Sequence, residues 1–338
     1  MEIAPATTAI QMSDASQVGE ARRAALRWAE FLRLGEGRVG SAATVATELA
    51  TNIIKHAKEG KILVQVVADN GHRGLQILAI DQGAGIRDVP AALTDGWSTS
   101  GTLGGGLGAI RRMADGFDLY TADNAGTIVL CELWREGEKP SAVRRTEVGI
   151  LSTPFPGETA NGDGWAVRRT GSQMLFMVVD GLGHGELASD AAREAERIVH
   201  ESTSYSPGTL VHDCHDALAK MRGAAIGVAV LNSDSRLVTF AGMGNVAGSI
   251  STAGSSRGLA SHNGTLGHAA GRIQEFTYPW EQESLLVLHS DGVSSRWSLD
   301  GYPGIRARHP SIIAAVLYRD FARARDDATI LVARNSLN

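Results

Sequence analysis

The stretch QMLFMVVDGLGHGELASDAA, residues 173–192, contains three local signals that together decide the fold of the second half of the chain. The apolar run before Asp180 predicts a buried β-strand that ends at this aspartate. The glycines that follow predict a turn in which backbone can approach a ligand closely. Helical periodicity over residues 186–200 predicts a long helix. A carboxylate at this turn would repel a phosphate unless a cation lay between them, so the stretch indicates a metal site rather than a nucleotide loop.

Other aspartates also stand where apolar runs begin or end. Asp291 ends SLLVLHSD, Asp326 and Asp327 precede ATILVAR, and Asp163 lies in NGDGW before a further predicted strand. Carboxylates at strand ends can form a site for hard cations, and two such ions can activate water for in-line attack on phosphorus. Asp-Gly pairs also mark ordinary turns, so we state the convergence of these aspartates as an expectation.

Five motifs of the second half occur in a fixed order: ETANGDGW, VVDGLGHGELASDAA, FAGMGNV, LHSDGV and DDATILV. Together they resemble the SpoIIE/RsbX branch of the metal-dependent type 2C protein phosphatases over about residues 146–334. The resemblance implies an α/β/β/α sandwich, two Mn²⁺ or Mg²⁺ ions, and hydrolysis without a phospho-enzyme. It implies that the bridging ligand and catalytic residue is Asp180, and that the other metal ligands are Asp163, the Gly181 carbonyl, Asp291 and Asp326.

Some polar residues of the second half leave two interpretations open. His184 is either a general acid or a residue that orients its turn. His212 and His215 resemble a zinc pair, but the apolar stripe of their helix places them on its outer face and favours a solvated surface. Arg168 and Arg169 suit a phosphate group chemically, although the motif alignment does not identify either as a substrate residue.

The first half carries a different pattern on a predicted helix, residues 41–57. Thr44, Glu48, Asn52 and His56 follow each other at intervals of four and form one row. An asparagine oxygen suits Mg²⁺, and a carboxylate one turn away suits a general base. For the helix alone a solvated face is the simpler reading, and we interpret His56 as a helix-end residue.

Two glycine-rich motifs favour a functional site over a solvated helix face. Asp81 ends a predicted strand and can accept a hydrogen bond from the exocyclic amine of adenine, while Gly83 and Gly85 allow the ring to approach the backbone. GGGLG, residues 104–108, precedes a predicted helix whose backbone amides can hold phosphates. A Rossmann unit fits poorly, because this glycine run does not directly follow a strand.

The ordered set ELATN, DQGAG and GGGLG resembles the GHKL (Bergerat) ATP-binding fold, and within it the anti-sigma-factor-type serine/threonine kinases of the RsbT/RsbW group. The resemblance covers roughly residues 15–134. It implies ATP with Mg²⁺ on Asn52, Glu48 as the catalytic base, and Asp81 on adenine. It implies phosphate contacts from Gly104, Gly105, Gly106, Leu107 and Gly108. A sensor histidine kinase would need an acceptor histidine in a preceding helical hairpin, and the helical stretch before Ser41 contains none.

Length, charge and cysteine count indicate the class of protein. The chain has 338 residues, a net charge of −5 and two cysteines, which favours packed domains without a disulfide framework. We predict an α+β protein with an N-terminal extension (1–14), an ATP-binding domain (15–134), a linker (135–145) and a phosphatase domain (146–338). With no basic patch and no apolar run of membrane-spanning length, we expect a cytoplasmic protein that binds neither nucleic acid nor membrane.

The two motif sets predict a bifunctional partner-switching regulator, whose kinase and phosphatase domains act on STAS-domain proteins. A second hypothesis makes the first domain a nucleotide-gated binding module for a sigma factor or a STAS partner. A third makes the chain a scaffold, which the retained aspartates argue against. The sequence leaves the partner, the signal and the oligomeric state open, a homodimer included.

Overall fold

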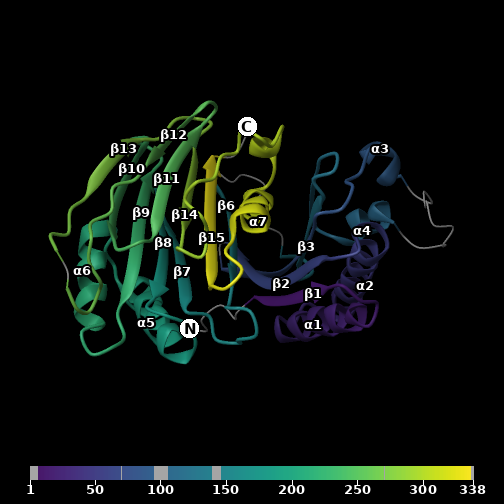
Figure 1. Cartoon of the computed structure of the whole chain (residues 1–338), viewed down its shortest axis with the longest axis horizontal. Helices are drawn as coiled ribbons and strands as arrows, with labels where there is room; N and C mark the ends of the chain where they lie inside the picture. Colours follow the sequence, from purple (N-terminus) through teal and green to yellow (C-terminus); the bar gives the residue numbers. More distant parts are fainter. Residues whose placement is uncertain (1–6, 70, 95–105, 139–145, 270, 336–338) are drawn as a thin grey trace. The chain divides into compact units, whose positions relative to one another are not determined.

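The computed structural model describes residues 7–69, 71–94, 106–138, 146–269 and 271–335. The chain divides into two compact units (Figure 1). The first comprises Met1–Val143 with Gly301–Arg319, and the second comprises Arg144–Asp300 with Asp320–Asn338. The first crossing between the units lies in the predicted linker. The sequence predicted that residues 146–338 form one domain, whereas residues 301–319 belong to the first unit.

The first unit contains a five-stranded antiparallel sheet in the order β1-β2-β3-β5-β4. Its strands are β1 (Thr8–Met12), β2 (Gly60–Asp69), β3 (His72–Asp81), β4 (Gly116–Thr121) and β5 (Thr127–Trp134). Two long helices, α1 (Gln17–Phe31) and α2 (Glu36–Asn52), pack on one face of this sheet. Two short helices, α3 (Val89–Ala92) and α4 (Leu107–Met113), follow β3 in the chain.

Small residues allow close packing between helices and sheet. The buried residues of α1 are all alanines, and those of α2 are alanines with Val45 and Leu49. They meet the sheet residues of one face, among them Ile62, Ile77 and Val129. Successive strand residues point to opposite faces, so each strand also presents a second set of side chains to the other side.

The opposite face of this sheet carries a buried polar ladder. Gln65, Gln76 and Glu132 are direct neighbours in register on β2, β3 and β5, and all three are buried. The Gln65 amide donates to Gln76 Oε1 at 2.7 Å, and the Gln76 amide donates to Glu132 Oε1 at 2.9 Å. The Gln76 amide also donates to Ser311 Oγ at 3.2 Å. Ser311 belongs to α7 (Pro310–Phe321), a helix buried on all sides from Pro310 to Tyr318, which thus reaches the centre of this face.

The second unit contains two five-stranded antiparallel sheets. One has the order β13-β10-β9-β8-β7, formed by β7 (Asp163–Thr170), β8 (Gln173–Gly181), β9 (Ala224–Asn232), β10 (Leu237–Met243) and β13 (Phe276–Pro279). The other has the order β12-β11-β14-β15-β6, formed by β6 (Thr146–Thr153), β11 (Ala247–Thr252), β12 (Ser255–Gly258), β14 (Leu285–His289) and β15 (Ala328–Asn335).

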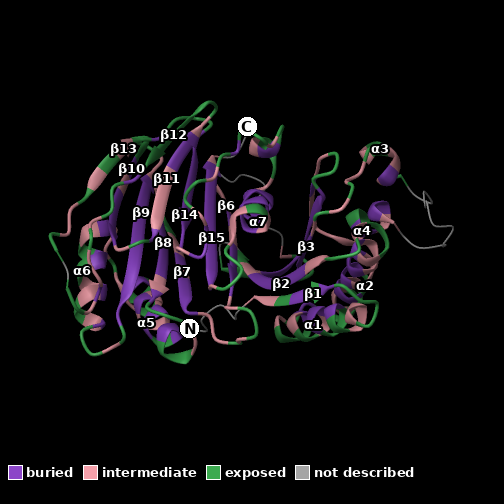
Figure 2. Ribbon diagram, viewed as in Figure 1, coloured by how far each residue is buried: buried purple, intermediate pink, exposed green. Residues whose placement is uncertain are grey.

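Side chains of alternating direction on β8 build two cores. Phe176 and Val178 pack between the two sheets, against residues such as Leu288 and Leu331. Leu175 and Met177 point the other way and pack under α5 (Glu186–Glu201) and α6 (Pro207–Ala217). In Figure 2 the central strands are buried along most of their length, whereas α5 and α6 alternate between buried and exposed residues. The unit is thus a helix layer on a sandwich of two sheets.

Two predicted helices differ from the observed ones. The helix expected over residues 41–57 begins earlier, at Glu36, and changes at Ile53 into a π-helix, η1 (Ile53–Ala57). The helix expected from Leu107 ends at Met113, because Gly116 and Phe117 already belong to β4. A short 3₁₀ helix, η2 (Ile305–Ala307), precedes α7. In the described parts of the chain, no helix combines the length and the apolarity that a bilayer crossing requires.

Candidate functional site

Four of the predicted metal ligands lie at ends of strands in the second unit. Asp163 opens β7 and Asp180 stands next to the end of β8, and the two are directly opposite in the antiparallel register. Asp291 follows β14, and its backbone amide donates to Asp180. Asp326 precedes β15, the strand that pairs with β14. The strand ends of the two sheets therefore make these carboxylates neighbours, and their role as metal ligands stays a prediction.

Burial and mutual repulsion disfavour ionisation of three of these carboxylates. Burial raises the pKa of Asp180 to about 7, and the charges of Asp291 and Asp326 act in the same direction. Burial, followed by the charge of Asp180, raises the pKa of Asp163 well above its usual range. Burial and the charges of Asp291 and Asp327 also raise the pKa of Asp326. A bound cation would favour the ionised forms of all of them.

Three hydrogen bonds fix the carboxylates in place. Ser290 Oγ donates to Asp163 Oδ2 at 2.6 Å, and the Asn245 amide donates to Asp291 Oδ2 at 2.6 Å. The backbone amide of Phe155 donates to Asp327 Oδ1 at 2.8 Å. Sequence reasoning did not assign Ser290 or Asn245 a role, although both lie inside quoted motifs, LHSDGV and FAGMGNV. Asp327 is buried and points to the loop before β7 rather than joining the predicted ligand set directly.

The glycines of this edge are required by close contacts between backbone segments. A Cβ at Gly181 would lie 2.3 Å from the carbonyl oxygen of Ala188, and one at Gly292 would lie 1.8 Å from that of Asp327. Both distances are far below van der Waals contact. The Gly181 amide also donates to the Gly162 carbonyl at 2.9 Å, which ties the end of β8 to the start of β7.

The donor chemistry of this edge fits Mg²⁺ or Mn²⁺. Its side chains are carboxylates, which hard divalent cations prefer, and their mutual repulsion is the kind that a cation relieves. Among the residues that the structure describes, no three histidine, cysteine, aspartate or glutamate side chains are grouped so that they could hold a metal ion. The fit of these neighbouring carboxylates to a divalent cation therefore rests on their chemistry.

His184 is held beside this edge by two neighbours. Its Nδ1 lies 2.5 Å from Glu158 Oε1, and its ring stacks on Phe155 with a centroid distance of 4.7 Å. The side chain is 55% exposed. The Phe155 amide also donates to Asp327. Glu158 and Phe155 thus orient the His184 ring, and more than half of its side chain is exposed. The two interpretations left open by the sequence are compatible with this arrangement.

Other candidate residues lie away from the acidic edge or have structural partners. Arg168 donates to the carbonyls of Val199 and Ser204 and stacks on the Tyr205 ring, toward the opposite end of β7 from Asp163. Arg169 donates to the Thr146 carbonyl. On α6, His212 is exposed, whereas His215 accepts from the Gly267 amide and so fastens a loop. His212 therefore lies on the outer face of the helix, as expected, and both cysteines are buried and free.

One buried acid near β7 gives a pH-dependent prediction. Burial raises the pKa of Glu196 to about 7, although Glu196 accepts a hydrogen bond from the Trp165 amide. Its carboxyl is more basic in the folded than in the unfolded protein, so its stabilising contribution is complete below pH 4.5 and is lost as pH rises through about 7. We expect Glu196→Gln to raise the free energy of unfolding at pH 8 by about 1–3 kcal/mol, with little effect at pH 4.

Thermal melts of the metal-free protein at both pH values measure this effect. The matched control is Glu186→Gln on the same helix, where the side chain is 77% exposed. Equal melting temperatures of Glu196→Gln and the unaltered protein at pH 8 would contradict the assignment.

In the first unit, Asp81 at the end of β3 is prepared for an acceptor role. Its Oδ1 accepts from the backbone amides of Gly83 at 2.8 Å and Thr127 at 3.1 Å. Burial raises the pKa of Asp81, and the amides of Gly83 and Thr127 together with the charges of Arg319 and His56 counteract this. The Oδ1 bonds orient the carboxylate, and its second oxygen has the chemistry that an adenine amine requires.

The two glycines after Asp81 have a structural reason that differs from the expected one. A Cβ at Gly83 would lie 2.8 Å from Ala57 Cβ, and one at Gly85, where φ is +77°, would lie 2.3 Å from the Ala122 carbonyl oxygen. Close packing of chain segments therefore requires these glycines whether or not a ring approaches them. Thr121, which sequence reasoning missed, accepts from the Ile86 amide at 2.9 Å and holds the same loop.

The predicted row spans the end of α2 and the π-helix that follows it. Glu48 and Asn52 are both partly exposed, and Asn52 is the last residue of α2. His56 is exposed and lies in η1, near the end of the helical segment. Among the predicted phosphate contacts, Gly104 and Gly105 lie outside the described residues. Gly106 directly precedes α4, and Leu107 and Gly108 open that helix.

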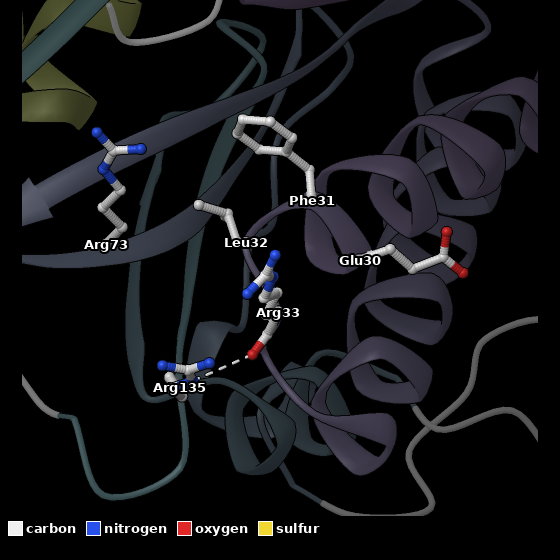
Figure 3. Close-up of a pocket in the computed structure, with 6 residues that line it drawn as sticks. All are labelled: Glu30, Phe31, Leu32, Arg33, Arg73 and Arg135. Carbon is white, nitrogen blue, oxygen red and sulfur yellow. Dashed lines mark hydrogen bonds between the residues drawn. The ribbon is translucent and has the colours of Figure 1, made fainter. Parts of the chain in front are cut away.

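A separate cavity of about 620 Å³ lies elsewhere in the first unit (Figure 3). Arg33, Arg73 and Arg135 surround it at the end of α1, and Arg135 donates to the Arg33 carbonyl at 3.2 Å. Arg73 and Asp81 stand at opposite ends of β3, so this cavity is not part of the Asp81 site.

Comparisons with known proteins match both halves of the chain. The model of the histidine kinase-like ATPase domain matches residues 12–132, and that of stage II sporulation protein E matches residues 170–336. Serine/threonine-protein kinase RsbT of Bacillus subtilis (strain 168) is 44% identical over 103 residues, which are 30% of this chain and 77% of that protein. Phosphoserine phosphatase RsbX of the same organism is 25% identical over 139 residues, which are 41% of this chain and 70% of that protein.

One solved structure extends the comparison to three dimensions. It comes from work on the bacterial stressosome, described as a modular system adapted to control secondary messenger signaling. It is 26% identical, with a TM-score of 0.53, and the match covers 56% of this chain and 100% of the solved chain.

Proposed function

The chain belongs to the family of the serine/threonine kinase RsbT, with a histidine kinase-like ATPase domain, and it also carries a SpoIIE-type serine/threonine phosphatase domain. We propose that it both adds phosphate to a small regulatory protein and removes it. The observation that carries the proposal is the presence of two separate acidic sites in one chain. One is the oriented Asp81 carboxylate of the first unit, and the other is the group of carboxylates on the second unit's strand ends.

In the proposed kinase site, each residue has one task. Asp81 accepts from the adenine amine, and Asn52 supplies an oxygen to the Mg²⁺ that accompanies ATP. Glu48, one helical turn before Asn52, accepts the proton of the attacking serine or threonine hydroxyl. Backbone amides of residues 104–108 hold the phosphates.

In the proposed phosphatase site, Asp180 would be the central ligand for divalent cations. The Gly181 carbonyl, Asp291 and Asp326 would be the further ligands, and Asp163 would support the group from β7. When bound, Mg²⁺ or Mn²⁺ supplies positive charge that favours attack of water on phosphorus. The protein's own contribution is to hold the carboxylates together, through Ser290 and Asn245, at the meeting point of two rigid sheets. His184, oriented by Glu158, is placed to give a proton to the leaving hydroxyl.

The proposed substrate is a STAS-domain protein, because kinases and phosphatases of the RsbT and RsbX kind act on such proteins in partner-switching pathways. The alternative partner is a sigma factor. The proposed use of ATP and of a regulatory protein favours a cytoplasmic location.

A direct assay tests the proposal. The full chain is incubated with ATP, Mg²⁺ or Mn²⁺, and the STAS-domain protein encoded nearest to it, and phosphoprotein and free phosphate are followed over time. Phosphate release that requires both ATP and the STAS protein supports the two activities. ATP binding without transfer to any offered partner would instead favour a nucleotide-gated binding module, and would contradict the kinase half of the proposal.

A further inference from the structure

The segment 301–319 is fastened to the first unit by polar contacts along its length. Arg308 Nη1 lies 3.2 Å from Asp118 Oδ1, and the His309 amide donates to Asp118 Oδ2 at 2.6 Å. Ser311 meets the polar ladder at Gln76, as described above. Further along α7, Lys61 Nζ donates to Tyr318 Oη at 2.8 Å. The helix is therefore held near both of its ends.

The last contact of this series lies at the proposed nucleotide site. Arg319 Nη1 donates to the Ala125 carbonyl at 2.6 Å and approaches the Asp81 carbonyl at 3.4 Å. These carbonyls belong to two segments that already meet, because a Cβ at Gly126 would lie 2.0 Å from the Asp81 carbonyl oxygen. One segment carries the Asp81 carboxylate. The other leads into Thr127, whose amide donates to that carboxylate.

We propose that Arg319 is a positioning residue of the nucleotide site, which holds the backbone of Asp81 and Ala125 so that the Asp81 carboxylate faces the adenine ring. The inference rests on the proposed ATP-binding function and adds a residue to it. Arg319 lies inside the stretch that matches the SpoIIE family, 170–336, far from the ATPase match in sequence. Its positive charge also counteracts the effect of burial on the pKa of Asp81, and so favours the ionised acceptor.

The segment that carries Arg319 is joined in the chain to two proposed metal ligands of the phosphatase domain. The segment 292–325, which carries Arg319, begins directly after Asp291 and ends directly before Asp326. If a nucleotide that orders Asp81 restrains Arg319 and thereby changes the affinity for a metal ion, the metal ion must change the affinity for the nucleotide by the same factor.

The experiment measures nucleotide binding by calorimetry, using ADP and GDP with Mg²⁺ on the full chain. We expect a roughly ten-fold or greater loss in ADP affinity with Arg319→Ala, because binding must then order the backbone of Asp81 and Ala125 that Arg319 otherwise holds. We also expect the preference for ADP over GDP to fall, because a displaced Asp81 carboxylate accepts less well from the adenine amine. Arg319→Lys, which keeps a cation that can donate, should recover part of both effects.

Two matched variants separate positioning from loosening of the helix or of the fold. Arg308→Ala removes an anchor of the same segment away from Asp81, and Arg27→Ala removes an exposed arginine on α1. Both should bind ADP within about two-fold of the unaltered chain. In the unaltered chain, ADP should shift the Mn²⁺ concentration that gives half-maximal hydrolysis of p-nitrophenyl phosphate, and Arg319→Ala should reduce that shift.

The outcomes distinguish this inference from the function on which it rests. If the unaltered chain binds neither ADP nor ATP, the proposed nucleotide site is wrong and Arg319 has no role there. If the unaltered chain binds ADP and prefers it to GDP, but Arg319→Ala does so equally well, only the positioning role is overturned. Weak binding by Arg319→Ala with unchanged base preference also overturns it, since general loosening would produce that result.

Discussion

Asp180→Asn is expected to reduce metal-dependent hydrolysis of p-nitrophenyl phosphate by at least about 10³-fold, because the residue is proposed to be the central ligand for divalent cations. Asparagine has nearly the same shape as aspartate but lacks the charge. The measurement is the initial rate at saturating Mn²⁺. Asp216→Asn, an exposed residue on α6, is the matched control and should retain full activity.

Asp180→Asn is expected to lower activity but to raise the stability of the metal-free protein. In the metal-free protein Asp180 is a buried carboxylate beside Asp291 and Asp326, which repel it. A neutral amide removes that repulsion, so metal-free Asp180→Asn should melt at a higher temperature than the unaltered chain. Loss of activity together with a lower melting temperature would indicate a structural role for Asp180 and would contradict the metal-ligand assignment.

Glu48→Gln is expected to lower phosphoryl transfer to the STAS-domain protein by about 10²- to 10⁴-fold, the range typical of a lost general base. ADP binding should remain close to that of the unaltered chain, because Glu48 is assigned to the acceptor hydroxyl rather than to the nucleotide. The measurement pairs the rate of phosphoprotein formation with calorimetry. Glu36→Gln, an exposed glutamate in the first turn of the same helix, is the control. Unchanged transfer by Glu48→Gln would remove this residue from the mechanism.

Local patterns in the sequence were sufficient to predict much of the acidic site. Apolar runs that end in Asp180 and Asp291 identified buried strands, and adjacent glycines identified the turns, because both signals act over a few residues. Their meeting at one edge follows from strand pairing, which places Asp163 opposite Asp180. Ser290 and Asn245 were not singled out, because a hydrogen bond to a distant residue leaves no local pattern.

Two features of the first unit depend on contacts that sequence reasoning could not reach. The change to a π-helix at Ile53 occurs in a stretch whose residue types gave no sign of it. The assignment of residues 301–319 to the first unit depends on contacts such as those of Ser311 with Gln76 and of Arg319 with Ala125. Each joins positions that lie far apart in the chain, and α7 alone reads as an ordinary buried helix.

The central claim is that one chain puts phosphate on a protein and takes the same phosphate off, and a sequential experiment with two variants tests it most directly. Asp180→Asn, with ATP and Mg²⁺, first phosphorylates the STAS-domain protein, and mass spectrometry identifies the modified residue. The phosphoprotein, freed of ATP, is then treated with Glu48→Gln and Mn²⁺. We predict that Asp180→Asn accumulates phosphoprotein and that Glu48→Gln removes the phosphate from that same residue. No phosphoprotein in the first step, or a phosphate that persists in the second, would contradict the account.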